Sequence, residues 1–265
     1  MNFSTYLQGI IAGYVRGSDF PTPPASLEIA LSASDPLADG TGLTEPSAAD
    51  GYERQTITLA PSVATVGAGV SAFNNAPIVF GPVANNAWPT VTHVAIFDNS
   101  GNMLMHGELN VQRTSPVGDE LPMAVNALQV QTASYFGHYF GQMIIEWIRG
   151  VPAPTAPTST ELGLSLTDPL EDGSTLDEPT LGYTRQVITF AAPSATATGT
   201  PIVSEGPYIF GPADTNWGLI TYGVVFTNSG DILIKACSHS TERCTKRFFC
   251  RAVWGSDNSF FVRSK

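Results

Sequence analysis

Apolar residues at helical spacing open the chain and return near its middle. They recur every three or four positions over residues 3–15 and again over residues 136–148. Ser4 or Thr5 in the first stretch and Ser134 before the second are candidate N-caps. The pattern predicts two short amphipathic helices. Their aromatic stripes either pack on their own sheet or dock against another subunit.

Alternation of apolar and polar residues follows each helical stretch. It covers residues 27–31 and 162–166, and longer apolar runs follow at residues 91–97 and 219–226. Each longer run leads into Asn-Ser-Gly, a sequence that favours a tight turn between two strands. We therefore expect short antiparallel strands joined by hairpins after each helix.

The order of these elements is duplicated. Asp-Pro-Leu-x-Asp-Gly occurs at residues 35–40 and 168–173, and each copy is followed by Glu-Pro, Gly-Tyr-x-Arg-Gln, Phe-Gly-Pro and Trp. A repeat of this length indicates two similar units. The fold class predicted is mainly β, with two tandem antiparallel β-sandwich or barrel-like domains, each preceded by a short amphipathic helix. The predicted domains are residues 1–130 and residues 131–265.

The repeated acidic stretch is the first place to look for chemistry. Carboxylates this dense could bind calcium, but neither copy has the ligand order of a helix-loop-helix calcium site, and Asp-Pro and Asp-Gly are ordinary turn sequences. We expect a solvated turn, with the arginine that follows either pairing with a carboxylate of the acidic loop or lying at an interface. The candidate turn and clamp residues are Asp35, Asp39, Arg54, Asp168, Asp172 and Arg185.

Large aromatic residues also recur at matching places in the two copies. Each Phe-Gly-Pro segment is followed by a tryptophan at nearly the same distance. Aromatic side chains of this size usually fill the end of a core. The predicted core aromatics are Phe80, Trp88, Phe210 and Trp217.

Composition and charge narrow the class of protein. Of 265 residues, 43% are hydrophobic and 13% are charged, and 25 Gly with 20 Pro fit many turns between short strands. The net charge of −11 argues against a nucleic-acid partner, which requires clustered Lys and Arg. Residues 236–265 differ from the rest, because they carry six basic and two acidic side chains and show no counterpart of the first copy's final strand pattern. Either this end diverged for a separate contact, or a reading-frame change replaced it.

No enzyme motif is present. The chain has no Gly-x-Ser-x-Gly elbow and no phosphate loop, and His93 and His106 occur in the first copy alone. All three cysteines lie in the basic tail, and the spacing of Cys237, Cys244 and Cys250 around His239 lacks the Cys-x-x-Cys pair typical of zinc sites. We expect no catalytic, cofactor-binding or metal-binding residues, and no secretory signal or membrane span.

The shared order of motifs resembles a family of small structural proteins encoded in tailed-bacteriophage virion gene clusters, often labelled tail-fibre-like. The residues that carry the resemblance are the leading helix, Asp35-Pro36, Gly51-Tyr52-x-Arg54-Gln55, Phe80-Gly81-Pro82 and Trp88. The resemblance covers most of residues 1–130 and again 135–235. It implies a non-enzymatic virion component with no catalytic residues.

The position in the virion is a separate question. A fibre shaft needs long heptads or a β-helix repeat, and the chain has neither. Two compact acidic units instead favour a capsid cement or decoration protein, which would clamp neighbouring copies of the phage major capsid protein by avidity. The alternatives are a tail, baseplate or fibre-associated attachment protein, and a carbohydrate-binding adhesin with exposed tryptophans. We expect a homo-oligomer, made in the host cytoplasm, on the virion exterior, with no nucleic-acid or membrane partner.

Overall fold

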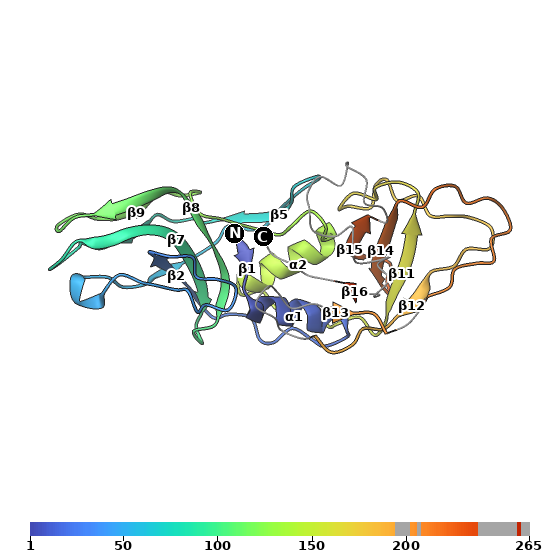
Figure 1. Ribbon diagram of the computed structural model, residues 1–265, viewed down its shortest axis with the longest axis horizontal. Helices are drawn as coiled ribbons and strands as arrows, with labels where there is room; N and C mark the ends of the chain where they lie inside the picture. Colours follow the sequence, from blue (N-terminus) through green and yellow to red (C-terminus); the bar gives the residue numbers. More distant parts are fainter. Residues whose placement is uncertain (194–201, 206–207, 238–258, 261–265) are drawn as a thin grey trace.

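The computed structural model describes residues 1–193, 202–205, 208–237 and 259–260 (Figure 1). Over these residues the fold is mainly β, as predicted, with two α-helices, α1 (Thr5–Val15) and α2 (His138–Ile148), and one 3-10 turn, η1 (Ala48–Asp50). The strands are β1 (Asn2–Phe3), β2 (Leu27–Ser32), β3 (Gln55–Ile57), β4 (Val63–Thr65), β5 (Gly69–Phe73), β6 (Ile78–Phe80), β7 (Trp88–Asp98), β8 (Met103–Ser115), β9 (Leu121–Met123), β10 (Gln129–Gln131), β11 (Thr160–Ser165), β12 (Gln186–Ile188), β13 (Ile202–Val203), β14 (Tyr222–Thr227), β15 (Ile232–Cys237) and β16 (Ser259–Phe260).

Each repeat builds one main antiparallel sheet with the same strand order. From equivalent edges, the first sheet runs β3-β2-β7-β8-β1 and the second runs β12-β11-β14-β15, where an isolated bridge between Phe136 and Ile234 takes the place of the pairing between β1 and β8. The registers match as well, since Leu27 lies between Ile57 and Asp98 as Thr160 lies between Ile188 and Thr227. The described strands form separate sheets and do not close into a barrel, so the barrel-like alternative is not detected.

Smaller sheets complete the first repeat and recur in part in the second. β5 lies between β4 and β10, and β6 pairs with β9. In the second repeat, β13 pairs with β16 as β5 pairs with β10. The sequence pattern of the basic tail shows no such strand, yet residues 259–260 stand in this position.

The two helices begin in different ways. Ser4 caps α1, because its hydroxyl oxygen accepts a hydrogen bond from Leu7 N at 3.1 Å. The expected cap Ser134 does not cap α2, which instead follows Gly137. A Cβ at Gly137 would lie 2.0 Å from the carbonyl oxygen of Ile232. Close approach to β15 therefore excludes any residue with a side chain at this cap.

The helices lie side by side between the two main sheets (Figure 1). Tyr14 of α1 stacks on Phe140 of α2 with ring centroids 5.6 Å apart. α1 packs against β8 of its own sheet, whereas α2 packs against β15 of its own sheet and against β4 and β5 of the first repeat. Buried side chains of both repeats therefore form one continuous core. Each helix contacts both its own sheet and the other repeat.

Candidate functional site

The repeated acidic stretch folds into the same turn in both copies. Asp35 accepts a hydrogen bond from Leu37 N at 3.0 Å, and Asp168 accepts one from Leu170 N at 2.9 Å. Both leucines have positive φ, 60° and 54°, a conformation uncommon for residues other than glycine. An aspartate that bonds the backbone two residues ahead stabilises such a turn.

The second aspartate of each stretch closes the turn. Asp39 accepts a hydrogen bond from Thr41 N at 3.1 Å, and Asp172 accepts one from Ser174 N at 3.0 Å. These backbone hydrogen bonds lower the pKa of both carboxyls. In the described part of the chain, no three His, Cys, Asp or Glu side chains gather as metal ligands would. All four aspartates therefore contribute to backbone conformation.

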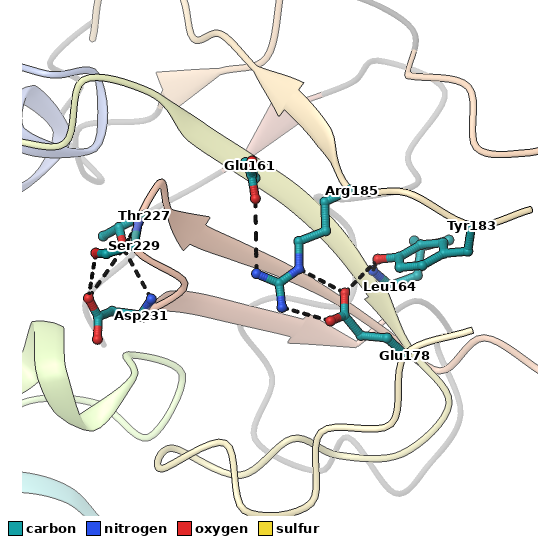
Figure 2. Close-up of polar contacts among 8 residues, drawn as sticks. All are labelled: Glu161, Leu164, Glu178, Tyr183, Arg185, Thr227, Ser229 and Asp231. Atoms are coloured by element: carbon teal, nitrogen blue, oxygen red, sulfur yellow. Dashed lines mark hydrogen bonds and ion pairs between the residues drawn. The ribbon is translucent and has the colours of Figure 1, made fainter. Parts of the chain in front are cut away.

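A four-residue cluster follows the turn in the second repeat (Figure 2). Arg185 donates from Nε and Nη2 to the two carboxylate oxygens of Glu178 at 2.9 and 2.7 Å. Tyr183 donates its hydroxyl proton to Glu178 at 2.8 Å, and Leu164 N donates to the Tyr183 hydroxyl oxygen at 2.8 Å. The cluster thus connects the acidic loop to the backbone of β11.

The first repeat contains the same cluster. Arg54 donates to Glu45 at 3.0 and 2.8 Å, Tyr52 donates to Glu45 at 2.8 Å, and Leu31 N donates to the Tyr52 hydroxyl oxygen at 2.9 Å. The carboxylate partner is therefore the glutamate of the Glu-Pro pair and neither aspartate of the turn. Sequence reasoning named the arginines but not the tyrosines, although Gly-Tyr-x-Arg-Gln recurs in both copies.

Partial burial and hydrogen bonding fix the charges of this cluster. Burial alone would raise the pKa of Glu178, but the hydrogen bonds from Arg185 and Tyr183 outweigh it and hold that pKa below its ordinary value. Burial raises the pKa of Tyr183, so its hydroxyl keeps its proton. The Arg185 guanidinium lies 3.6 Å from the centre of the Phe226 ring. A carboxylate paired in this way is suited to holding a loop and not to accepting a substrate proton.

A second charged cluster lies between the repeats. Lys235 on β15 donates to Asp168 at 2.7 Å and lies 3.3 Å from a carboxylate oxygen of Glu171. The other oxygen of Glu171 accepts a hydrogen bond from Gly67 N, in the turn between β4 and β5 of the first repeat, at 2.7 Å. Glu171 is only 3% exposed. The acidic stretch of the second repeat thereby binds the first repeat directly.

The equivalent place in the first repeat has different chemistry. His106 lies opposite Asp35, with Nδ1 3.3 Å from the carboxylate, as Lys235 lies opposite Asp168. Burial lowers the pKa of His106. Ala38 replaces Glu171, yet the backbone agrees, because Ala38 O accepts from Thr5 N as Glu171 O accepts from His138 N, both at 2.7 Å.

Reciprocal hydrogen bonds join the two repeats. The residue that ends α1, Arg16, donates to the carbonyl oxygen of Phe190 beyond β12, at 3.1 Å. The residue that ends α2, Arg149, donates to the carbonyl oxygen of Leu59 beyond β3, also at 3.1 Å. Trp147 of α2 further donates to the carbonyl oxygen of Pro21 at 2.8 Å. Each repeat thus binds the other through an arginine at the end of its helix that donates to a backbone carbonyl oxygen.

The predicted core aromatics lie at corresponding places but differ in burial. Phe80 and Trp88 are buried, with 0% and 4% of their surfaces exposed. Phe210 and Trp217 are only partly buried. In both repeats the tryptophan ring packs against the cluster tyrosine, and Trp88 Nε1 donates to Asp50 O at 2.9 Å. Burial of Trp88 removes it as an exposed stacking platform for a sugar.

Of the three tail cysteines, Cys237 alone lies in the described part of the chain. Cys237 ends β15, whereas His239, Cys244 and Cys250 lie outside the described residues. No helix in the described part of the chain is both long and apolar enough to cross a bilayer.

The described residues form duplicated turns, charge clamps and a common core, and they include no catalytic site. These features define a structural module. A family model described as podophage GP4 fiber I protein gp80 matches residues 2–131 and again residues 136–237. The chain belongs to this family of phage fibre proteins; it is a non-enzymatic structural protein of the virion. A comparison with curated proteins found no match.

The family corrects the preferred functional hypothesis from sequence. The match supports the fibre-associated alternative better than the capsid-cement hypothesis. Acidic charge and compact β units led to the cement prediction because they describe a solvated module. They carry no information about which virion component the module binds.

Proposed function

We propose that this protein is a structural element of a phage tail fibre, on the exterior of the virion, where it binds other tail proteins. The observation that carries the proposal is the match of one fibre-protein family to both repeats in turn. The domains expected from sequence, residues 1–130 and 131–265, would then be two fibre units in one chain.

The contacts between the repeats support a mechanical role. Reciprocal arginine bonds, the Glu171–Gly67 bond and a continuous apolar core join the units. A joint with this many buried contacts keeps two outer surfaces at a fixed separation. Rigidity of this type suits an element that must hold its neighbours at fixed positions along a fibre. Self-association of the chain is part of the proposal.

A phage with the gene deleted tests the function. We expect particles with intact, heat-stable capsids that lack fibre density in electron micrographs and adsorb poorly to the host. Complementation with the wild-type gene should restore both properties. Capsids that lose heat stability while their fibres remain complete would support the cement hypothesis instead.

A further inference from the structure

The joint between the repeats combines symmetric and asymmetric contacts. Arg16 and Arg149 form equivalent bonds to the opposite repeat. The glycine after each arginine also lies close to the opposite repeat. A Cβ at Gly17 would lie 3.3 Å from Pro157 O, and a Cβ at Gly150 would lie 3.1 Å from Pro24 O. Contacts that are equivalent in both directions would serve equally well between two copies of the same repeat. They cannot select which repeat pairs with which.

Two acidic side chains of the second repeat break this equivalence. One is Glu146 on α2, which accepts a hydrogen bond from Ser62 N of the first repeat at 2.9 Å, whereas the equivalent residue of α1 is Gly13. The other is Glu171. Glu171 reaches from the second repeat to Gly67 N in the first, and Lys235 compensates its charge within the second repeat. The corresponding residue of the first repeat is Ala38, which has no side-chain acceptor. Ala38 occupies the same backbone position as Glu171, so the difference lies in the side chain and not in the fold.

We propose that Glu171, supported by Lys235, is a specificity-determining residue of the joint, and that its partner is the Gly67 turn of a first repeat. A pair of two first repeats would place Ala38 opposite that turn and leave Gly67 N without its carboxylate. A charge-assisted hydrogen bond of this type discriminates by about ten-fold or more. The cluster therefore directs a first repeat to a second repeat, within one chain or between two copies of it.

The test inserts a protease recognition sequence after Ala133, an exposed residue between the repeats, in the full-length chain. The folded protein is cleaved, unfolded in denaturant and refolded, and native mass spectrometry identifies the pairs by mass. With the wild-type residues, first–second pairs should exceed first–first pairs by about ten-fold over a statistical mixture. In the double variant Glu171→Ala, Lys235→His, which copies the first repeat at these two positions, this excess should fall several-fold.

Asp177→Ala serves as the control, because Asp177 is an exposed carboxylate of the same loop. This variant should keep the wild-type selectivity. Equal selectivity in the double variant and the wild type would overturn the proposal, as would wild-type halves that pair at random or remain single. Where the refolded halves aggregate, amide hydrogen exchange of the uncleaved proteins replaces the measurement. Exchange at the Gly67 turn should become faster in the double variant and not in Asp177→Ala, and unchanged exchange there in the double variant would overturn the proposal.

Discussion

Replacement of Arg185 by Met tests the clamp that holds the acidic loop to the second sheet. The change keeps an aliphatic chain beside Phe226 but removes two charge-assisted hydrogen bonds to Glu178. The Arg185 side chain is 24% exposed and Glu178 is 23% exposed, so solvent screens part of the interaction. We expect a loss of about 2–3 kcal/mol, below the ~3–5 kcal/mol typical of a fully buried pair that loses one partner.

Calorimetry at neutral pH provides the measurement. For a folded region of this size, that loss corresponds to a fall in Tm of roughly 4–12 °C. The Tm of Arg185→Lys should lie between those of Arg185→Met and the wild type, since an ammonium retains the charge but cannot form the planar two-bond contact. Arg54→Met, the equivalent change in the first repeat, should cost a similar amount. A change below about 0.5 kcal/mol in both Met variants would refute the assignment of these clusters as clamps.

Three further predictions concern pH, the helices and the joint. The folded-state pKa of Glu178 is lowered, so the stability that this carboxylate contributes is present above the ordinary glutamate pKa and is lost as pH falls through the folded-state pKa. The free energy of unfolding in urea, measured from pH 6 to 3, should therefore depend less steeply on pH in Glu178→Gln than in the wild type. Gly137→Ala should destabilise the protein strongly, by about 3 kcal/mol or more, because the new Cβ would overlap a carbonyl of β15. Gly9→Ala should instead stabilise it by about 0.5–1 kcal/mol in the same assay, because a Cβ at this mid-helix position would have nothing within 4 Å. Arg16→Ala should cost about 1–3 kcal/mol, and Arg149→Ala should cost more because Arg149 also ion-pairs with Glu146. A loss of unfolding free energy below about 0.5 kcal/mol in both variants would contradict the reciprocal joint.

Periodicity and repetition were sufficient to predict the helices, several strands and the duplication. Apolar spacing located α1 and α2 to within two residues at each end, and alternation at residues 27–31 located β2. Such patterns are local, since one face of a helix or strand must be buried. The identity of the surface covering that face is not local. Sequence therefore leaves open whether the helices pack on their own sheets or against another subunit. In the structure α1 packs on β8 of its own sheet, and α2 packs on β15 of its own sheet and on β4 and β5 of the first repeat.

The clamps show the same limit at the level of single residues. Arg54 and Arg185 stand out because basic residues are rare before the tail, and the prediction of a loop carboxylate partner needed only the adjacent acidic loop. Choosing among several carboxylates requires the register of strands that pair across the sheet. The Glu171–Gly67 bond joins residues 104 positions apart and has no sequence signature. Comparison of the two copies, Glu171 against Ala38, is the one signal that could have indicated it.

The position of the protein in the virion tests the central claim most directly. A short epitope tag inserted after Gly118, in an exposed turn after β8, should leave the fold intact, because a Cβ at Gly118 would meet no atom within 4 Å and the hydrogen bond from Gly118 N to Val83 O can be kept. Gold-labelled antibody on purified tagged phage, viewed by electron microscopy, should mark the tail fibres and leave the capsid shell unlabelled. Label spread over the capsid, at a copy number close to that of the shell protein, would contradict the assignment.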